Sequence, residues 1–250
     1  MKSFAISSLV LFSTFMLSIN AFADTSAKIA TVIADDLRTA DEKARDETRK
    51  PAETLAFFGL EKDMAVTELF PGGGWYTKIL AGVLKEEGEL TVALGLRFLK
   101  DNPEKWGYTH VKRDGDSYKL VDTKRSGIFD LEGPGLSVSN QDMVLTFRNA
   151  HNLTPQARKT LNASVFEALK PGGIYGVVDH TRRHMEPDSK ERWRRVDPVQ
   201  IIKEALEAGF EFVDYSDLHH QPTDALTHDT RHKSVKPDSD RFTLKFRKPQ

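Results

Sequence analysis

Apolar runs alternate with amphipathic segments along this chain from about residue 60 onward. The runs have the composition of buried strands, and the segments between them repeat their apolar residues at helical spacing. The predicted strands are MAVTELF (64–70), ELTVALGL (89–96), DMVLTF (142–147), IYGVV (174–178), FEFVDYS (210–216) and RFTLKF (241–246). The predicted helices cover 75–88, 154–169 and 197–209. This alternation predicts an α/β fold with a doubly wound, mainly parallel sheet and helices on both faces.

The two ends of the chain depart from this alternation. FEFVDYS and RFTLKF have no helix between them, so we expect them to pair antiparallel. Ahead of the first strand, apolar residues recur at helical spacing from Ile29 to Ala40, and Pro51 opens a short helix with Gly59 near its end. Residues 97–140 carry turn signals and only short apolar runs. The chain is therefore divided into a targeting segment (1–23), an N-terminal helical cover (24–60) and an α/β domain (61–250).

The targeting segment has the pattern of a cleavable export signal. Lys2 is the only charged residue before Asp24, and the apolar stretch between them closes on Ala21-Phe22-Ala23, which fits signal peptidase. Cleavage after Ala23 predicts a periplasmic or secreted protein, and an uncleaved membrane anchor is the alternative. No later apolar run approaches the length of a bilayer span, so none is expected after cleavage.

Composition narrows the classes of partner. The 36 basic and 37 acidic residues nearly cancel, so no nucleic-acid partner is expected and a small molecule is favoured. There is no cysteine, which excludes disulfides, a thiol nucleophile and a cysteine-ligated metal. The sequence does not indicate an oligomeric state.

A glycine-rich turn, ELFPGGGWYT (68–77), follows the first strand. Ligands of doubly wound sheets sit at the carboxyl ends of the strands, where a backbone without Cβ atoms lets them approach and the next helix offers free N–H groups. Three glycines alone also make a plain tight turn.

The wider pattern resembles the class I S-adenosylmethionine-dependent methyltransferases. The first motif of that family is an acid followed by spaced glycines, and Glu68, Phe70, Gly72 and Gly74 occupy its positions, with Phe70 in place of the first glycine. ALKPGG before IYGVVDH, and the closing AGFEFVDYS and RFTLKFRKP, are also typical of the family. With PGGGWYT, FRNAHN and VVDH, the set looks most like a subgroup of exported predicted methyltransferases, over residues 51–249.

The resemblance implies a Rossmann-like sheet of seven strands with an antiparallel last strand, and S-adenosylmethionine as cosubstrate. The residues that it places at the cofactor are Glu68, Phe70, Gly72, Gly73, Gly74, Tyr76 and Thr77. Glu68 would orient the loop or accept a hydrogen bond from the cofactor's ammonium. The family's acid at the end of the second strand, which holds the ribose hydroxyls, has no counterpart here, because ELTVALGLRF has Leu94, Gly95 or Leu96 at that point and Arg97 next.

Polar residues follow the fourth predicted strand in TFRNAHN. We expect Arg148, Asn149 and Asn152 to contact a substrate and His151 to act as a general base near neutral pH. Methyl transfer is an in-line displacement, so alignment of nucleophile and methyl group supplies much of the rate. The alternative is that His151 and Asn152 cap the helix that starts at Thr154.

A second polar cluster ends the fifth predicted strand in VVDH, where Asp179 and His180 are candidate catalytic residues. Adjacent strands would bring His180 near Arg148 and His151. An aspartate-supported histidine is a suitable base, and a structural hydrogen-bonded pair is the alternative. The basic stretch that follows, HTRRHMEPDSKERWRRVD, would hold an anionic or lipid-head substrate or form a solvated loop.

Two arginines of the N-terminal cover are candidate substrate-binding residues. Arg45 and Arg49 lie four residues apart in EKARDETRK and would share one face of a helix. In the family this region covers the cofactor cleft, so the pair would bind a carboxylate or hold the cover in place. An ordinary solvated helix face is the alternative.

The connection between the last two strands is rich in histidine: DLHHQPTDALTHDTRH contains His219, His220, His228 and His232. The spacing of His228 and His232 would chelate a metal on a helix. Thr, Pro and Asp favour a loop instead, and no metal is expected. A flap that faces the substrate is the preferred role.

These features favour an exported enzyme that transfers a methyl group from S-adenosylmethionine to a small or lipid-like acceptor. S-adenosylmethionine is a charged cytosolic metabolite that would have to be delivered to an exported enzyme. A small-molecule-binding protein on the same scaffold is therefore the second hypothesis. A metal-assisted hydrolase that uses the histidine-rich loop is the third, and it needs at least three converging ligands.

Overall fold

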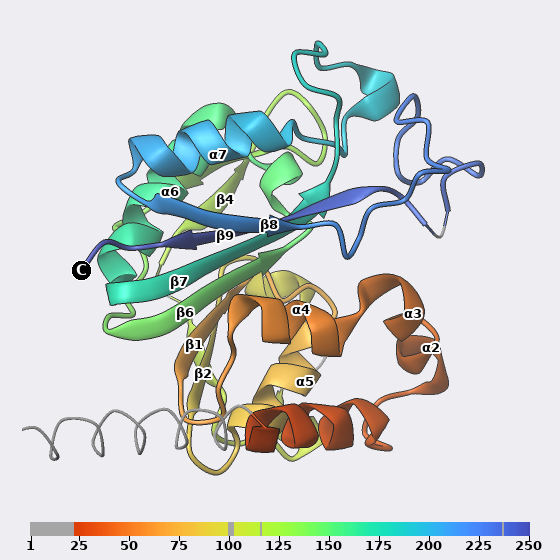
Figure 1. Cartoon of the computed structure of the whole chain (residues 1–250). Helices are drawn as coiled ribbons and strands as arrows, with labels where there is room; N and C mark the ends of the chain where they lie inside the picture. Colours follow the sequence, from red (N-terminus) through yellow and green to blue (C-terminus); the bar gives the residue numbers. More distant parts are fainter. Residues whose placement is uncertain (1–22, 100–102, 116, 237) are drawn as a thin grey trace, which may run out of the picture.

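The computed structural model describes residues 23–99, 103–115, 117–236 and 238–250 (Figure 1). Almost all of the expected export signal, residues 1–22, lies outside them. Within the described ranges, no helix is long and apolar enough to cross a bilayer. The helices are residues 23–34, α2 (Ala40–Lys43), α3 (Asp46–Arg49), α4 (Pro51–Phe58), α5 (Trp75–Leu84), α6 (Pro155–Ala168) and α7 (Pro198–Glu207). The strands are β1 (Ala65–Leu69), β2 (Glu89–Ala93), β3 (Lys112–Asp114), β4 (Lys119–Asp122), β5 (Phe129–Glu132), β6 (Gln141–Phe147), β7 (Leu169–His180), β8 (Glu211–Ser216) and β9 (Arg241–Arg247).

Seven strands of the described chain form one sheet in the order β3-β2-β1-β6-β7-β9-β8. In this sheet β9 runs antiparallel to both of its neighbours, β7 and β8, and the other pairings are parallel. This topology confirms the predicted α/β fold, its seven-stranded sheet and its antiparallel final pair. The strand order reverses between β1 and β6, so their carboxyl ends flank the switch point where doubly wound sheets bind ligands.

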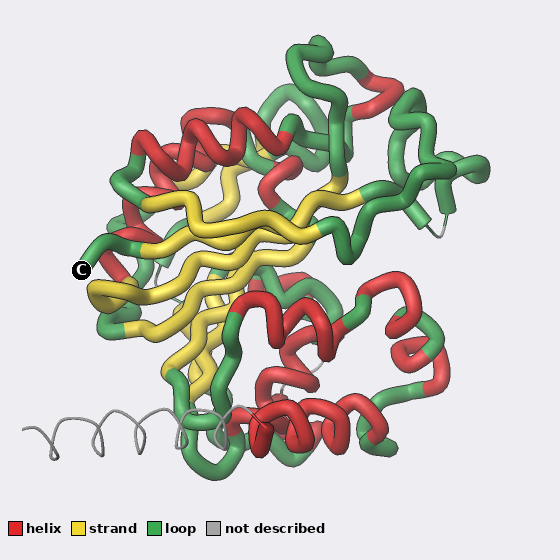
Figure 2. Tube along the Cα trace, viewed as in Figure 1, coloured by secondary structure: helices red, strands yellow, loops and turns green. Residues whose placement is uncertain are grey.

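Helices cover both faces of the sheet (Figure 2). The segment 23–34 packs with α4 and α5 on one face, around buried residues such as Phe58 and Leu80. On the other face α6 and α7 enclose a second core that includes Leu161 and Phe246. Because both faces are covered, β1 and β6 are buried along almost their whole length, which explains their nearly continuous apolar sequences.

The N-terminal cover is less regular than its apolar spacing predicts. The first helix ends at residue 34 and Leu37 is 44% exposed, so the expected continuation through Ala40 is wrong. Thr39 caps α2 in a capping box with Glu42, which starts a new helix at this point. The expected boundaries of α4 agree with the structure, with Pro51 first and Gly59 as its C-cap at a φ of 81°.

Residues 97–140 contain three short strands that the sequence pattern did not reveal. The three-residue β3 extends the main sheet, whereas β4 and β5 form a separate antiparallel hairpin. The hairpin packs against the second core through side chains such as Leu120 and Phe129. The carbonyl of Phe129 accepts a hydrogen bond of 3.0 Å from the N–H of Thr154. This bond holds the hairpin beside the start of α6, at the ligand-binding edge of the sheet.

The KPGG stretch differs from the predicted turn. The helix before it ends at Ala168, as expected from the sequence, but the chain passes directly into β7. The pairing with β6 shifts register between Gln141 and Met143, and Gly172 has a φ of 80°. The stretch is therefore an irregular start of β7.

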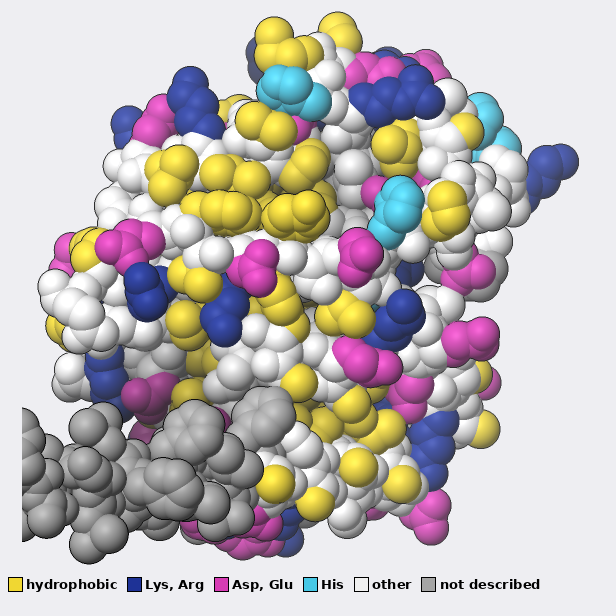
Figure 3. Space-filling model, in the orientation of Figure 1, with side chains coloured by type: hydrophobic (Ala, Val, Ile, Leu, Met, Phe, Trp, Pro, Cys, Tyr) yellow, Lys and Arg dark blue, Asp and Glu magenta, His cyan; other side chains and the backbone are white. Residues whose placement is uncertain are grey.

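The outer edge of the sheet carries exposed apolar side chains (Figure 3). They belong to α7 and to the edge strand β8: Val199, Leu206, Phe212, Val213 and Tyr215. None of these five lines a cavity of the site described below.

Candidate functional site

Three neighbouring strands end in a residue with a left-handed backbone. Phe70 follows β1, Leu94 follows β2 and Arg148 follows β6, with φ angles of 54°, 62° and 63°. This conformation costs a non-glycine residue about 1–2 kcal/mol. Hydrogen bonds to neighbouring strands hold two of the turns, from Phe70 N–H to the carbonyl of Ala93 and from Arg148 N–H to that of Val178. Clustered strain at the carboxyl edge of a parallel sheet marks a candidate binding site.

The glycine turn keeps its shape although a phenylalanine replaces its first glycine. At a φ of 54°, Phe70 has the backbone conformation that glycine adopts readily, so the replacement changes the side chain and leaves the turn intact. Gly74 starts α5, and a Cβ atom on it would lie 2.3 Å from a ring carbon of Trp106. A Cβ atom on Gly73 would meet nothing within 4 Å. Gly74 is therefore required by packing, whereas Gly73 faces open space.

Glu68 is the buried acid of the motif, with 2% of its surface exposed. It accepts a hydrogen bond of 2.5 Å from the hydroxyl of Thr77, which links β1 to α5 across the glycine turn. Burial raises the pKa of Glu68 to about 8, although the bond from Thr77 opposes this. The carboxyl group is therefore largely protonated at neutral pH.

Tyr76 joins the same turn to the end of β6. Its ring stacks on Phe147, with 3.6 Å between the centroids and 9° between the planes. Its hydroxyl donates to the carbonyl of Arg49 at 3.3 Å. Burial raises the pKa of this hydroxyl, so it stays neutral.

Two cavities adjoin the glycine turn. The first, here named the hairpin cavity, has a volume of about 380 Å³ and spans the ends of β2, β1 and β6 beneath the β4–β5 hairpin. Its lining includes Gly95, Ile128, Phe129, Asn152, Leu153 and Trp193. The second, here named the arginine cavity, has a volume of about 400 Å³ and lies between the glycine turn and the N-terminal cover. Its lining includes Glu42, Arg45, Arg49, Glu68, Gly73 and Arg148.

The two cavities share Phe70, Gly72 and Asn149 as lining residues. The side-chain amide of Asn149 donates to the carbonyl of Phe70 at 3.3 Å and to that of Phe147 at 2.9 Å. It thereby joins the ends of β1 and β6 at the boundary between the cavities. A single extended ligand can therefore reach both cavities along the edge of the sheet.

The arginine cavity contains the two arginines of the N-terminal cover and Arg148. Arg49 is only 4% exposed, so a solvated helix face is wrong for this residue. Its guanidinium lies 4.3 Å from the ring centre of Trp75. Arg45 is exposed at the rim, and Arg148 is half-buried. Burial, together with the nearby charges of Arg241 and Arg45, lowers the pKa of Arg148 to about 10.

The carboxylate of Asp179 binds His151 from the neighbouring strand end. It accepts hydrogen bonds from Nδ1 of His151 at 2.5 Å and from the backbone N–H of His151 at 3.0 Å. His151 lies in a 3₁₀ turn (Ala150–Asn152), and the hydroxyl of Thr154 caps α6, so neither His151 nor Asn152 supplies that cap. With Nδ1 donating to the carboxylate, Nε2 is the nitrogen that is able to accept a proton.

His151 faces a third, smaller cavity of about 180 Å³. This cavity shares Ile128, Leu153 and Trp193 with the hairpin cavity. His151 is therefore adjacent to the hairpin cavity and does not line it.

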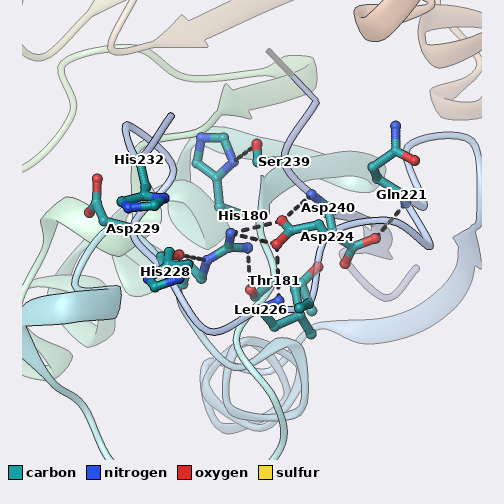
Figure 4. Close-up of polar contacts among 12 residues, drawn as sticks. His180, Thr181, Gln221, Asp224, Leu226, His228, Asp229, His232, Ser239 and Asp240 are labelled. Atoms are coloured by element: carbon teal, nitrogen blue, oxygen red, sulfur yellow. Dashed lines mark hydrogen bonds and ion pairs between the residues drawn. The ribbon is translucent and has the colours of Figure 1, made fainter. Parts of the chain in front are cut away.

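His180 is brought close to His151, with 5.4 Å between the ring centroids, but its own contacts are structural. Its Nδ1 is hydrogen-bonded to the hydroxyl of Ser239 at 2.9 Å (Figure 4). Burial, reinforced by the charges of Arg148 and Arg241, lowers the pKa of His180 well below its usual value. The side chain of Asp179 therefore supports His151, and His180 stays neutral.

The histidine-rich connection between β8 and β9, residues 217–240, is tied down at its base. Asp224 accepts hydrogen bonds from the backbone N–H groups of Leu226 and Asp240, and forms an ion pair with Arg195 in which both side chains are at most 1% exposed (Figure 4). His219, at one end, lies 2.9 Å through Nε2 from the carbonyl of Arg49. The connection thus links β7 to the N-terminal cover.

At the tip of this connection, the two described histidines of the expected pair contact each other and a serine. The rings of His228 and His232 stack with their centroids 4.1 Å apart, and Nδ1 of His232 bonds to Ser234. Within the described part of the chain, no group of three or more metal-ligating side chains converges. The three ligands that the hydrolase hypothesis requires are not brought together there.

Several residues of the site could not be found from the sequence. Arg241 starts β9 and donates to the carbonyl of Thr48 at 2.8 Å, and its charge helps to lower the pKa of Arg148 in the arginine cavity. Phe129 belongs to the unpredicted hairpin. Trp193 lies in the basic stretch HTRRHMEPDSKERWRRVD, and it is the residue of this group that the sequence signals, since an aromatic residue inside a charged loop commonly packs on a neighbour.

Comparison of the whole fold with solved structures identifies the same architecture in known proteins. A SAM-dependent methyltransferase from Aquifex aeolicus superposes with a TM-score of 0.55 and 15% identity, over 89% of this chain and 98% of that one. The [4+2]-cyclase SpnF gives a TM-score of 0.53 and 18% identity, over 86% of this chain and 84% of that one. Human N-acetylserotonin methyltransferase in complex with SAM gives a TM-score of 0.50 and 12% identity, over 84% of this chain and 54% of that one.

The fold is the Rossmann-like fold of S-adenosylmethionine-dependent methyltransferases. The sequence itself matches no protein-family model and no curated protein. Because SpnF has this fold and is named a cyclase, the architecture does not fix the reaction.

Proposed function

We propose that this protein transfers a methyl group from S-adenosylmethionine to a small acceptor. The observation that carries the proposal is the pair of adjoining cavities at the switch point of a methyltransferase-type sheet, on either side of the glycine turn. Each has the volume of a small-molecule site. Two neighbours with this fold, one of them in complex with SAM, carry names that state methyl transfer.

The residues present fit this cosubstrate in most respects. The hairpin cavity has apolar side chains such as Ile128 and Phe129 that suit the adenine ring, and Phe70 and Gly72 border both cavities. Glu68 and Gly73 in the arginine cavity would then face the methionine part. The ribose would be held by the amides of Asn149 and Asn152 in place of the family's carboxylate.

The bound sulfonium would supply an activated methyl group, whose bond to sulfur breaks as the acceptor's lone pair bonds to the methyl carbon and the sulfur leaves as a neutral thioether. The protein's part is to align the acceptor and to take up any proton that it releases. Asp179 binds Nδ1 of His151 and leaves Nε2 free to take this proton, but His151 faces the third cavity, so only an acceptor group that extends beside the hairpin cavity would reach it. Arg148 and Asn149 would position the acceptor beside the methyl group.

Isothermal titration calorimetry with S-adenosylmethionine and S-adenosylhomocysteine tests the proposal. We expect the purified mature protein to bind both at micromolar concentrations and the Gly73→Asp variant to lose at least a hundredfold in affinity. The new carboxylate would project into the arginine cavity, where no protein atom obstructs it.

The matched control is Gly115→Asp. A Cβ atom on Gly115 also meets nothing within 4 Å, and this residue lines neither cavity. The affinity of Gly115→Asp for S-adenosylmethionine and S-adenosylhomocysteine should stay within twofold of the wild type. A folded wild-type protein that gives no heat with either compound would contradict methyl transfer and favour a protein that binds another small molecule.

We further propose that the protein works after export, as a member of the exported methyltransferase subgroup that its sequence resembles. The support is the A-x-A pattern that ends at Ala23. Mass spectrometry of the protein from the periplasm of an expressing bacterium should find a chain that begins at Asp24. An intact N-terminus in the cytosolic fraction would contradict export.

A further inference from the structure

The arginine cavity has more positive charge than its own carboxylates balance. Four cationic side chains line it, namely Arg45, Arg49, Lys78 and Arg148, against the two carboxyl groups of Glu42 and Glu68. Glu42 is engaged by Lys78 at 3.0 Å. Glu68 bonds to Thr77 and is largely protonated at neutral pH. No ion pair joins the three arginines to a carboxylate of the described chain.

This imbalance contrasts with the third cavity, where the arginines are neutralised. Arg125 and Arg182 both pair with Asp188, Arg158 pairs with Glu204, and Arg195 pairs with Asp224. Among the described residues, none of the three arginines of the arginine cavity forms an ion pair of this kind.

Within the part of the chain that the structure describes, the guanidinium of Arg49 also lacks a hydrogen-bond partner for one of its buried nitrogens. Its Nη2 is buried and has no hydrogen-bond partner among the described residues. An unpaired buried donor of a charged group costs more than about 1–3 kcal/mol, so it is expected to have a partner in the working protein. Trp75 holds the guanidinium plane from one side, which leaves the N–H edges free to bind a planar oxyanion.

Binding of the cosubstrate would not remove the excess positive charge of the arginine cavity. S-adenosylmethionine carries an ammonium, a sulfonium and one carboxylate, so its binding adds net positive charge to the site. Its carboxylate would satisfy one guanidinium at most, and the others would remain beside the sulfonium. An anion is needed to balance them.

We propose that the methyl acceptor is an anion whose carboxylate or phosphate group is bound by Arg49 and Arg148, with Arg45 at the rim. The inference rests on the proposed methyltransferase function and adds the chemical class of the acceptor. Guanidinium groups bind such oxyanions through paired, charge-assisted hydrogen bonds. The methionine part of the cosubstrate would lie in the same cavity, beside Glu68 and Gly73, so the acceptor's anionic group would be bound next to it.

The experiment is calorimetric titration of the mature protein with inorganic phosphate and with acetate, at constant ionic strength set by chloride, with and without saturating S-adenosylhomocysteine. We expect one of the two anions to bind in both conditions, with affinities that agree within threefold. The anion that binds more tightly identifies the group on the acceptor. Arg49→Gln and Arg148→Gln should each weaken binding at least tenfold.

Two further variants make the test specific. Arg247→Gln, which alters an exposed arginine paired with Glu211, should leave anion affinity within twofold of the wild type. Arg45→Gln alters an exposed residue of the rim and should weaken binding by about threefold, which keeps the test valid if Arg49→Gln does not fold.

Three results would overturn the inference: no binding of either anion, no effect of the arginine variants, or displacement of the anion by S-adenosylhomocysteine. Displacement would mean that the arginines hold the carboxylate of the cosubstrate. Failure of S-adenosylhomocysteine to bind, with anion binding intact, would instead overturn the proposed function and leave the arginine cavity as the anion site of a binding protein.

Discussion

Replacement of Arg195 by Met is expected to lower the free energy of unfolding by about 3–5 kcal/mol, because it leaves a buried carboxylate without its counter-ion. Arg195 donates two hydrogen bonds to Asp224, at 2.7 and 3.0 Å. It also donates to the carbonyls of His228 and Thr181. One side chain thus joins the connection between β8 and β9 to the end of β7. Urea denaturation followed by circular dichroism measures the loss.

The matched control is Arg247→Met. Arg247 pairs with Glu211 through a similar double hydrogen bond, but both side chains are about half exposed, so the change should cost less than about 1 kcal/mol. Hydrogen exchange gives a local readout, since the amides of Leu226 and Asp240 bond to Asp224 and should lose protection in Arg195→Met. Equal losses in the two variants would show that the buried pair does not anchor this connection.

Replacement of Glu68 by Gln is expected to stabilise the protein at alkaline pH and to have little effect in acid. The pKa of Glu68 is raised from an ordinary value of 4.5 to about 8 in the folded state. The folded state therefore holds a proton that the unfolded chain releases. The contribution of this proton to stability is full below pH 4.5 and is lost as the pH rises to 8. The loss is on the order of 3–5 kcal/mol, at about 1.4 kcal/mol per pKa unit.

Glutamine keeps the shape and an acceptor for Thr77 but does not ionise. The difference in unfolding free energy between variant and wild type should therefore grow with pH from 4.5 to 8 and stay level beyond. Denaturation curves at intervals of one pH unit measure it. Glu89→Gln, at an exposed residue paired with Lys112 on the surface, should give a difference within about 0.5 kcal/mol at every pH. If the unfolding free energies of Glu68→Gln and the wild type changed in parallel with pH, the raised pKa of Glu68 would be contradicted.

The architecture was accessible from the sequence because the central strands of its sheet are buried on both faces. Such strands read as continuous apolar runs, and the helices between them have clear start signals, such as Thr154-Pro155 and Asp197-Pro198. The elements that were missed, β3 to β5, have three or four residues each and are partly exposed. Strands this short leave no periodic pattern, so only their tertiary contacts reveal them.

The sequence indicated residues of the candidate site but not the hydrogen bonds between them. The sequence predicted that His180 lies near His151, and their ring centroids are 5.4 Å apart. The sequence placed Asp179 beside His180, its neighbour in the chain, whereas the folded chain directs the carboxylate to Nδ1 of His151. Alternation along β7 sends adjacent side chains to opposite faces, so chain neighbours seldom form such a pair.

By itself, the sequence determined a doubly wound sheet with a glycine turn at its ligand edge, because burial pattern and turn chemistry are local properties. Tertiary structure alone decided which charges are neutralised. The basic stretch that reads as a solvated loop contains the buried Arg195, and the charged helix of the N-terminal cover contains the buried Arg49. Whether a guanidinium has a counter-ion depends on residues far away in the chain, such as Asp224 for Arg195. For that reason the unbalanced arginines, and with them the class of the acceptor, become apparent only in the folded protein.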